Sequence, residues 1–341
     1  IEESGSTMLP AELEASIYKF AEDIANEINY HGAGTVEFIF DIQNNCVYFM
    51  EMNTRLQVEH PVTEAVTGID IVKAQFDIAS GRSIADIKVN PRGYAIEVRV
   101  NAEKVALAED GAVTLRPSPG TLTECAFPVE KGVEILRAVG PNKVVPPFYD
   151  NMIAQVIIHG QDREDTILKM IHYLERIRIV GVALNIPLVI AILKDEIFRN
   201  GVYDTTFLKP FFKRADISAL IAATSQTEAS ANQNLSADAI KIEGTNELKV
   251  VAPSTGVFYT TASPNDPDMV SVGDAIKTTT PICLLEAMKL FTTLTLDDFN
   301  ATERTLYPND RTYKVVRIVA TSGQVVNPGD LMFVVAPTEN K

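Results

Sequence analysis

The chain has 341 residues, a length that predicts two or three domains. Apolar residues make up 46% and charged residues 22%, which is typical of a globular protein with well-filled cores. The net charge of −15 argues against a nucleic-acid or membrane partner, and no apolar run is long enough to predict a membrane-spanning helix. No basic-then-apolar leader is visible, although the chain opens without Met, so a processed or truncated start would hide one.

The three cysteines, Cys46, Cys125 and Cys283, are odd in number and far apart, and two of them lie in apolar, strand-like runs. This pattern predicts reduced thiols in a reducing compartment: the cytoplasm, or an organellar matrix if a leader was removed. The four histidines form no metal-spacing cluster with the cysteines, so we do not expect a zinc site.

Helix and strand patterns mix over the first two hundred residues. Apolar residues recur at helical spacing over 11–31, where Pro10 suits the helix start, and over 69–79, where Gly81 suits the helix end. Further elements are predicted as strands over 35–42, 46–52 and 94–101 and as helices over 164–175 and 186–198.

The two strands over 35–52 predict a hairpin centred on Asn44. This register places Glu37 opposite Glu51 on one face and Phe38 opposite Met50 on the other. Two carboxylates directly opposite one another are destabilising unless water or a cation separates them. Hard oxygen ligands suit Mg²⁺ or Mn²⁺, with nucleotide phosphates completing the coordination shell.

Residues 51–59, taken as extended, place five polar side chains on one face: Glu51, Asn53, Arg55, Gln57 and Glu59. Such a face can bind a metal and a small oxyanion, which Arg55 and Gln57 hold while Glu59 acts as a base. A solvated polar edge strand explains the same alternation, so spacing alone leaves both interpretations open.

The composition changes after the first domain. Residues 221–239 are mostly small and polar, and we predict a flexible linker over 214–247. From residue 248 onward, short strands separated by Gly and Pro turns predict a small β-sandwich. A Gly-Asp turn precedes an apolar strand twice, on either side of the run Glu286-Ala287-Met288-Lys289, which favours a pseudo-twofold sandwich with Lys289 at a hairpin tip. An ordinary surface lysine is the alternative.

We find a resemblance to the biotin carboxylases, which are ATP-grasp enzymes, in the run Glu51-Met52-Asn53-Thr54-Arg55-Leu56-Gln57-Val58-Glu59-His60-Pro61-Val62-Thr63-Glu64. The resemblance covers nearly all of residues 1–213 and continues through 68–70, 94–103, 117–120 and 146–152. Residues 248–337, with Ala-Met-Lys at 287–289, resemble a biotin carboxyl carrier domain. The implied fold class is α+β: the C-terminal part of an ATP-grasp biotin carboxylase, then a small all-β flattened sandwich of biotinyl/lipoyl type.

The resemblance implies cofactors for five residues. Glu37 and Glu51, with Asn53 beside them, are implied to bind Mg²⁺ or Mn²⁺ together with ATP. Arg99 is implied to stabilise the enolate-like form of biotin. Lys289 is implied to carry biotin as an amide, formed by a biotin protein ligase.

The same resemblance implies a bicarbonate site. Arg55, Gln57 and the backbone of Val58 would hold bicarbonate, and Glu59 would deprotonate it for attack on the γ-phosphate of ATP. Because the carboxyphosphate formed in this way is short-lived in water, an enclosed, charged site is expected.

The sequence contains no glycine-rich phosphate-binding loop, and the N-terminal half of the biotin carboxylase family, which precedes Glu37, has no counterpart here. We therefore expect that half to be a separate chain or to have been cut away, and we expect this chain alone not to carboxylate biotin. The other implied partner is a carboxyltransferase subunit, within a homo-oligomer or a multi-subunit complex.

Two features favour an acetyl-CoA carboxylase, or one with a broad range of acyl-CoA substrates. Residues 260–269 resemble the protruding thumb of acetyl-CoA carboxylase carrier domains. The linker is also too short for the folded domain that propionyl- and methylcrotonyl-type subunits insert at this position. Two other classes stay open: a non-catalytic carrier or assembly subunit that ferries carboxyl groups, and a lipoyl carrier, whose lysine usually lies in Asp-Lys-Ala.

Overall fold

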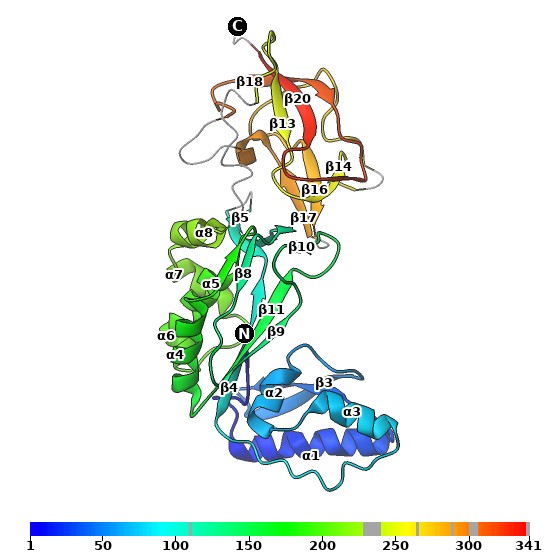
Figure 1. The fold of residues 1–341 in the computed structure, drawn as a ribbon, viewed down its shortest axis with the longest axis vertical. Coiled ribbons are helices and arrows are strands. Elements are labelled where there is room, and N and C mark those ends of the chain that lie inside the picture. Colours follow the sequence, from blue (N-terminus) through cyan, green and yellow to red (C-terminus); the bar gives the residue numbers. More distant parts are fainter. Residues whose placement is uncertain (109–110, 228–239, 264–265, 288–289, 300–305, 339–341) are drawn as a thin grey trace.

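The computed structural model describes residues 1–341 except 109–110, 228–239, 264–265, 288–289, 300–305 and 339–341. Three parts follow one another along its long axis (Figure 1). A hairpin with three helices lies at one end, a sheet flanked by helices lies in the middle, and an all-β part lies at the other end. Mixed helices and strands followed by an all-β sandwich confirm the predicted fold class.

The hairpin end consists of α1 (Ala11–Glu27), β2 (Thr35–Asp41), β3 (Cys46–Asn53), α2 (His60–Thr67) and α3 (Ile71–Ala79). The helix predicted over 11–31 ends earlier, at Glu27, and Asn29 has a left-handed φ of 49° that a helix does not continue. The prediction that 51–59 is extended is wrong beyond Asn53, because the chain leaves the strand and turns into α2. Pro61 in the first turn and the left-handed Gly68 at the end bound this helix.

The hairpin register changes partway along the strands. Glu37 pairs with Glu51 as predicted, but a β-bulge follows, so Phe38 pairs with Phe49 rather than with Met50. The bulge leaves one extra residue on β3 and shifts the pairing of every later residue by one. The run from Cys46 to Met50 is apolar on both faces, so its pattern gives no sign of this shift.

The central sheet orders its strands β1 (Glu2–Glu3), β4 (Tyr94–Asn101), β11 (Met152–Gly160) and β9 (Val133–Arg137), all antiparallel. The even-numbered Ile96, Val98 and Val100 of β4 are apolar and fully buried in a core that also includes side chains of α4 (Arg163–Leu174), and Tyr94 packs against it partly buried. The odd-numbered Glu97 and Arg99 point to the opposite face, together with Gln155 of β11, which pairs with Arg99. Short two-stranded sheets complete this part: β5 (Glu103–Leu107) with β6 (Val113–Pro117), β7 (Gly120–Thr121) with β10 (Val144–Val145), and β8 (Glu124–Ala126) with β12 (Arg178–Val180).

Four further helices follow α4: α5 (Ile186–Lys194), α6 (Glu196–Arg199), α7 (Leu208–Arg214) and α8 (Ile217–Ser225). The single helix predicted over 186–198 is two helices, because Asp195 is extended and its carboxylate caps α6. The linker predicted over 214–247 is wrong at its beginning, where α8 packs against α5 and β5. Small residues such as those of α8 are compatible with a helix as well as with a linker.

The C-terminal part is a sandwich of two four-stranded antiparallel sheets. One sheet orders β13 (Leu248–Val251), β20 (Leu331–Thr338), β18 (Thr312–Ile318) and β15 (Ala275–Ile276). The other orders β17 (Leu290–Leu294), β16 (Cys283–Ala287), β14 (Gly256–Tyr259) and β19 (Gln324–Val326), and a 3₁₀ turn, η1 (Leu296–Phe299), follows β17. Buried side chains from both sheets form one core.

The two Gly-Asp turns of the sandwich adopt the same local structure. Asp274 accepts a hydrogen bond from the Ser271 backbone N–H at 2.8 Å, and Asp330 accepts one from the Asn327 N–H, also at 2.8 Å. The glycine within each turn has a positive φ, which favours glycine. This repeated geometry is what the predicted pseudo-twofold sandwich requires.

A partly buried ion pair ties the N-terminal strand β1 to the helices of the central part. Arg163 Nε donates to Glu3 Oε1 at 2.8 Å, and the remaining guanidinium nitrogens donate to the carbonyls of Phe198 and Arg199. Tyr203 also donates to Glu3, whose side chain is only 8% exposed. Since both charges have partners, the pair is stable where it is, but either charge alone would be costly there.

Arg163→Ala should lower the free energy of unfolding by about 3–5 kcal/mol, because Glu3 would be left buried without its cation. Urea denaturation followed by the helical circular dichroism signal measures this loss, since the α-helices in the described residues lie within 11–225. Lys19→Ala is the control, because the Lys19–Asp23 pair on α1 is largely exposed and should contribute nothing measurable. Equal effects of the two substitutions would contradict the assignment.

Candidate functional site

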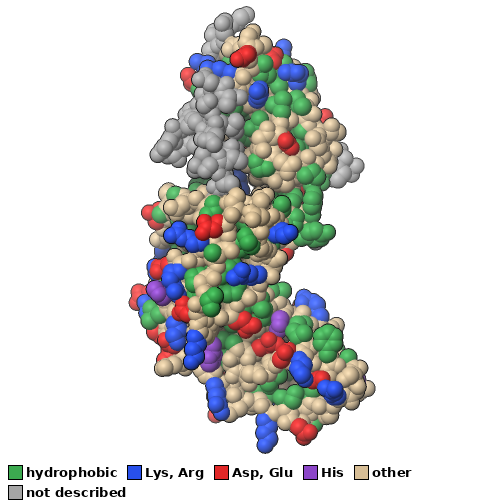
Figure 2. All heavy atoms as spheres, in the orientation of Figure 1, with side chains coloured by type: hydrophobic (Ala, Val, Ile, Leu, Met, Phe, Trp, Pro, Cys, Tyr) green, Lys and Arg blue, Asp and Glu red, His purple; other side chains and the backbone are tan. Residues whose placement is uncertain are grey.

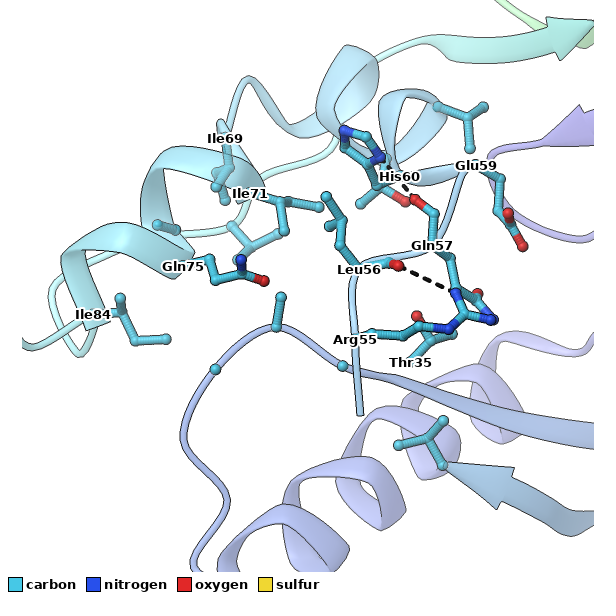
Figure 3. Close-up of a pocket in the computed structure, with 18 of the residues that line it drawn as sticks. Thr35, Arg55, Leu56, Gln57, Glu59, His60, Ile69, Ile71, Gln75 and Ile84 are labelled. Atoms are coloured by element: carbon cyan, nitrogen blue, oxygen red, sulfur yellow. Dashed lines mark hydrogen bonds between the residues drawn. The ribbon is translucent and has the colours of Figure 1, made fainter. Parts of the chain in front are cut away.

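A cavity of about 700 Å³ opens within the hairpin end, between the start of β2 and the helices α2 and α3 (Figure 3). One side is apolar, with Ile69, Ile71 and Ile84 pointing toward it. The other side is formed by the segment 54–59, from which Arg55, Gln57 and Glu59 project. A cavity with an apolar wall and a few convergent polar groups is the usual form of a small-molecule site.

The two facing carboxylates of the hairpin share amide donors. Asn53 Nδ2 donates to Glu37 Oε1 at 2.8 Å and to Glu51 Oε1 at 3.2 Å. Gln57 Nε2 donates to the same Glu37 oxygen at 3.0 Å. The structure therefore brings together Glu37, Glu51, Asn53 and Gln57, and the amide donors offset part of the repulsion between the carboxylates.

These carboxylates suit a hard divalent cation but supply only part of its shell. Carboxylate and amide oxygens are the ligands that Mg²⁺ and Mn²⁺ prefer. Glu37 and Glu51 provide carboxylate oxygens at one place, whereas Asn53 turns its amide nitrogen toward them and would have to rotate its amide to offer its oxygen to the same cation. Among the described residues, no group of three or more His, Cys, Asp or Glu side chains could hold a metal ion. The residues thus fit a cation whose remaining ligands come from a substrate, as in nucleotide sites.

Arg55 and Val58 face outward in the segment 54–59. The Arg55 side chain is exposed, and its Nη1 donates to the Leu56 carbonyl at 3.2 Å (Figure 3). Val58 is exposed too, and the turn after it begins α2, where the His60 ring lies 2.8 Å from the Gln57 carbonyl. An exposed guanidinium beside backbone groups of a turn can receive a small oxyanion without losing an existing partner carboxylate.

Arg99 joins two carboxylates at the edge of the cavity. Its Nη2 lies 3.0 Å from Glu59 Oε2 and 3.2 Å from Glu2 Oε1, and all three side chains are about one third exposed. Figure 2 shows acidic side chains gathered on the face where the hairpin end meets the central part. The predicted base and the predicted biotin-site arginine are thus paired with each other here through Glu59 Oε2.

Three residues that contact the predicted site were not predicted from the sequence: Glu2, Glu97 and Gln155. Glu97 is fully buried, and its Oε1 accepts a hydrogen bond at 2.7 Å from Gln155 Nε2, which also donates to the Val58 carbonyl at 2.7 Å. Burial raises the pKa of the Glu97 carboxyl; Glu2 and Glu59 act in the same direction, and Gln155 and Arg99 oppose them. The one available signal was the charged pair Glu97 and Arg99 alternating with apolar residues along a strand.

The strands predicted on either side of Lys289 are confirmed. β16 and β17 pair from Cys283 with Leu294 to Ala287 with Leu290, while Lys289 itself lies outside the described residues. At the hairpin, Tyr259 donates to Glu286 Oε2 at 2.8 Å, and Phe291 is exposed. A hairpin with exposed apolar flanks is suited to contact another protein.

The same hairpin lies against the central part of the chain. A cavity of about 470 Å³ is lined by residues 114–117 on β6 and by 290–293 on β17. Arg116 Nη1 lies 3.5 Å from Asp298 Oδ1, an ion pair between the two parts. In Figure 1 this contact is at the opposite end of the central sheet from α1 to α3, so the hairpin and the cavity of Figure 3 are far apart.

Three family models match the chain. "Carbamoyl-phosphate synthase L chain, ATP binding domain" matches residues 1–87, "Biotin carboxylase C-terminal domain" matches 97–210, and "Biotin-requiring enzyme" matches 248–298. Biotin carboxylase 1 of Bacillus subtilis is 41% identical over 213 residues, which is 62% of this chain and 46% of that protein. The chain therefore spans about half the length of the curated relatives it matches.

Two solved structures extend the comparison. The biotin carboxylase domain dimer of Hydrogenobacter thermophilus 2-oxoglutarate carboxylase, in complex with MgADP, ADP and bicarbonate, is 37% identical, with a TM-score of 0.57. That match covers 63% of this chain and 47% of the solved chain. A single-chain, multi-domain long-chain acyl-CoA carboxylase is 27% identical, with a TM-score of 0.56, and the match covers 99% of this chain and 31% of that one.

Of the helices in the described part of the chain, none combines the length and apolar character that a bilayer crossing requires.

The Glu97 carboxyl should make stability depend on pH. In the unfolded chain a glutamate ionises near pH 4.3. Since the folded-state pKa is raised, the folded chain holds the extra proton between the two pKa values, and the free energy of unfolding falls as pH rises through that window. Glu97→Gln removes this loss, so urea denaturation should show the variant gaining more over the natural chain at pH 7.5 than at pH 5. The same difference at both pH values would contradict the prediction.

Proposed function

We propose that this chain, which joins biotin carboxylase C-terminal and ATP-binding domains to a biotin/lipoyl-type domain, is a component of a biotin-dependent carboxylase. The observation that carries the proposal is a pair of neighbouring clusters. Hydrogen bonds join Glu37, Glu51, Asn53 and Gln57, and an ion pair joins Glu59, two residues further along the chain, to Arg99. The reaction is the ATP- and bicarbonate-dependent carboxylation of biotin, followed by delivery of the carboxyl group to a carboxyltransferase.

In this reaction Glu37, Glu51 and Asn53 would hold Mg²⁺ or Mn²⁺. The cation would neutralise the phosphates of ATP and lower the barrier to attack at the γ-phosphate. A relative solved with MgADP and bicarbonate supports this assignment. Asn53 holds the two carboxylates side by side, so their oxygens are already placed for a shared ligand.

Bicarbonate would lie on the segment 54–59. Arg55, Gln57 and the Val58 backbone would hold its oxygens, and Glu59 would remove its proton. The carbonate oxygen then forms a bond to the γ-phosphorus, the bond from that phosphorus to the β-phosphate oxygen breaks, and ADP and carboxyphosphate result. Glu59 keeps the proton. Arg99, which is released from Glu59 as this occurs, would be free to stabilise the negative charge of the enolate-like form of biotin.

Lys289 would carry the biotin as an amide on the tip of the β16–β17 hairpin. When bound there, biotin supplies a nitrogen that accepts the carboxyl group and carries it between two active sites. The match of residues 248–298 is to a model of the biotin/lipoyl type, and the biotin carboxylase match over 97–210 in the same chain favours biotin over lipoate. The partners would be a biotin protein ligase, the other half of a biotin carboxylase and a carboxyltransferase subunit, in an oligomeric complex.

The acyl acceptor would be an acyl-CoA, with acetyl-CoA as the first candidate. Thr261 and Asp268 form a β-bridge, and the Met269 N–H donates to the Thr260 carbonyl at 2.8 Å. These contacts bring the two ends of the predicted thumb segment together, which supports the assignment; residues 264–265 lie outside the described residues. The long-chain acyl-CoA carboxylase that matches 99% of this chain supports the acyl-CoA class. The three free cysteines suit a reducing location, which we propose to be the cytoplasm or an organellar matrix.

Lys289→Arg should abolish biotinylation, because the arginine guanidinium does not form the amide. Intact mass and streptavidin binding, after expression with an active biotin ligase, measure this. Lys277→Arg in the same sandwich is the control and should keep one biotinyl group per chain. A natural chain that stays unmodified under these conditions would contradict the carrier role.

Glu59→Gln should lower bicarbonate-dependent ATP cleavage by about 10²- to 10⁴-fold, the usual contribution of a general base. The assay uses the carboxylase that contains this chain together with the other biotin carboxylase half. Glu22→Gln, on the exposed face of α1, is the control and should leave the rate unchanged. An unchanged rate in Glu59→Gln would favour the alternative function, a non-catalytic carrier or assembly subunit.

A further inference from the structure

The buried side chain of Gln155 makes two hydrogen bonds that cross between elements of the site, one of them buried and the other part-buried. It lies in the middle of β11, opposite Arg99 of β4, and its side chain is only 7% exposed. Its Nε2 lies 2.7 Å from the Val58 carbonyl oxygen and 2.7 Å from Glu97 Oε1. Because both partners are used as acceptors, both amide hydrogens are engaged, and the nitrogen must face the segment 54–59.

We propose that Gln155 is a positioning residue, which holds the turn formed by Gln57, Val58 and Glu59 against strand β4. The effect of Gln155 on bicarbonate kinetics rests on the proposed function, whereas its structural role in holding the turn does not. Gln155 touches no predicted substrate. It acts through the peptide group of Val58, which precedes Glu59 and belongs to the predicted bicarbonate site.

Two interactions bind this turn to the central sheet, and they differ in kind. The Arg99–Glu59 ion pair is about one third exposed and joins two groups that the reaction needs free. The Gln155–Val58 hydrogen bond is part-buried, with its donor side chain only 7% exposed, and it joins two uncharged groups that exchange no proton in the reaction. When Glu59 accepts a proton or Arg99 binds a ligand, the ion pair opens, and the Gln155 bond keeps the turn in place.

Glu97 fixes the orientation of the Gln155 side-chain amide. Its Oε1 takes the second hydrogen of the Gln155 amide, while Oε2 has no hydrogen-bond partner among the described residues. A rotated Gln155 amide would place its oxygen against two other oxygens and lose both bonds. The buried carboxyl thus selects the one amide orientation that can hold Val58.

The test compares hydrogen exchange of the full chain in peptides covering residues 54–62. Gln155→Leu removes both donors at similar volume and should speed exchange there at least about fivefold, the effect of one net hydrogen bond of about 1 kcal/mol. Gln155→Lys keeps donors for both acceptors and should stay within about twofold of the natural chain. Thr166→Val, which removes a buried hydroxyl on α4, is the control for general destabilisation and should leave these peptides unchanged.

Exchange over 54–62 that is the same in Gln155→Leu and Thr166→Val would overturn the proposal, whether or not the chain is catalytic. If Gln155→Leu does not fold, Gln155→Ser, whose hydroxyl is too short to reach Val58, is judged by the same criterion. Rescue by Gln155→Lys separates a hydrogen-bonding role from a packing role, because Lys and Leu differ in donors more than in the space they fill.

A second readout uses the complete carboxylase that contains this chain. Gln155→Leu should raise the KM for bicarbonate about tenfold while kcat changes less than about threefold, since a misplaced turn weakens binding before chemistry. An unchanged KM in an active enzyme would overturn the proposal. A natural enzyme without bicarbonate-dependent ATP cleavage would refute the proposed function instead, and the exchange experiment would then decide the positioning role alone.

Discussion

The alternation of side chains along β4 is the constraint on which the rest of this structure depends. Its even-numbered Ile96, Val98 and Val100 enter a fully buried apolar core beneath α4, so a slip by one residue would bring Glu97 and Arg99 into that apolar core. The same fixed register forces Glu97 and Arg99 onto the opposite face. The core therefore determines where the site is built, and the sheet provides the rigid support that a binding site needs.

On the polar face of this sheet, the described carboxylates outnumber the cations. Arg99 is one cation between Glu2 and Glu59, and Glu97 is buried close by with one amide donor. Further along, Glu37 and Glu51 face each other with amide donors between them. An excess of negative charge in one place is tolerated where it will meet cations, and both clusters border the segment 54–59.

Sequence patterns predicted this site in part. The Glu37–Glu51 pairing followed from the hairpin centre, but the bulge after it did not, because the apolar run from Cys46 to Met50 carries no periodicity. Asn53, Gln57 and Glu59 do border one site, although the chain is not extended between them, so the resemblance to biotin carboxylases predicted their grouping better than alternation did. Gln155 lies 97 residues from Val58 along the chain, and no local pattern can reveal a contact of that range.

Apolar periodicity and turn residues predicted a helix or strand correctly where the local sequence alone determines its structure. The helix over α4 followed from periodicity, and the C-terminal sandwich with its β16–β17 hairpin followed from short strands and the repeated Gly-Asp turns. The helix α8 did not, because its run of Ala, Ser and Thr continues into a polar stretch that resembles a linker, and its packing against α5 and β5 cannot be read from the local sequence. Local sequence preference thus predicted the helices and strands that the local sequence can specify alone, and tertiary packing determined the others.

The contact between β6 and the β16–β17 hairpin determines how firmly the sandwich is held against the central part of the chain. The ion pair of Arg116 with Asp298 is 3.5 Å long and about one quarter exposed, and a cavity of about 470 Å³ lies beside it. A partly exposed ion pair of this kind contributes about 0–1 kcal/mol. For the carrier role proposed above, such a pair does little to hold the β16–β17 hairpin at β6, and a ligand or partner that binds the released hairpin needs little differential affinity to overcome it.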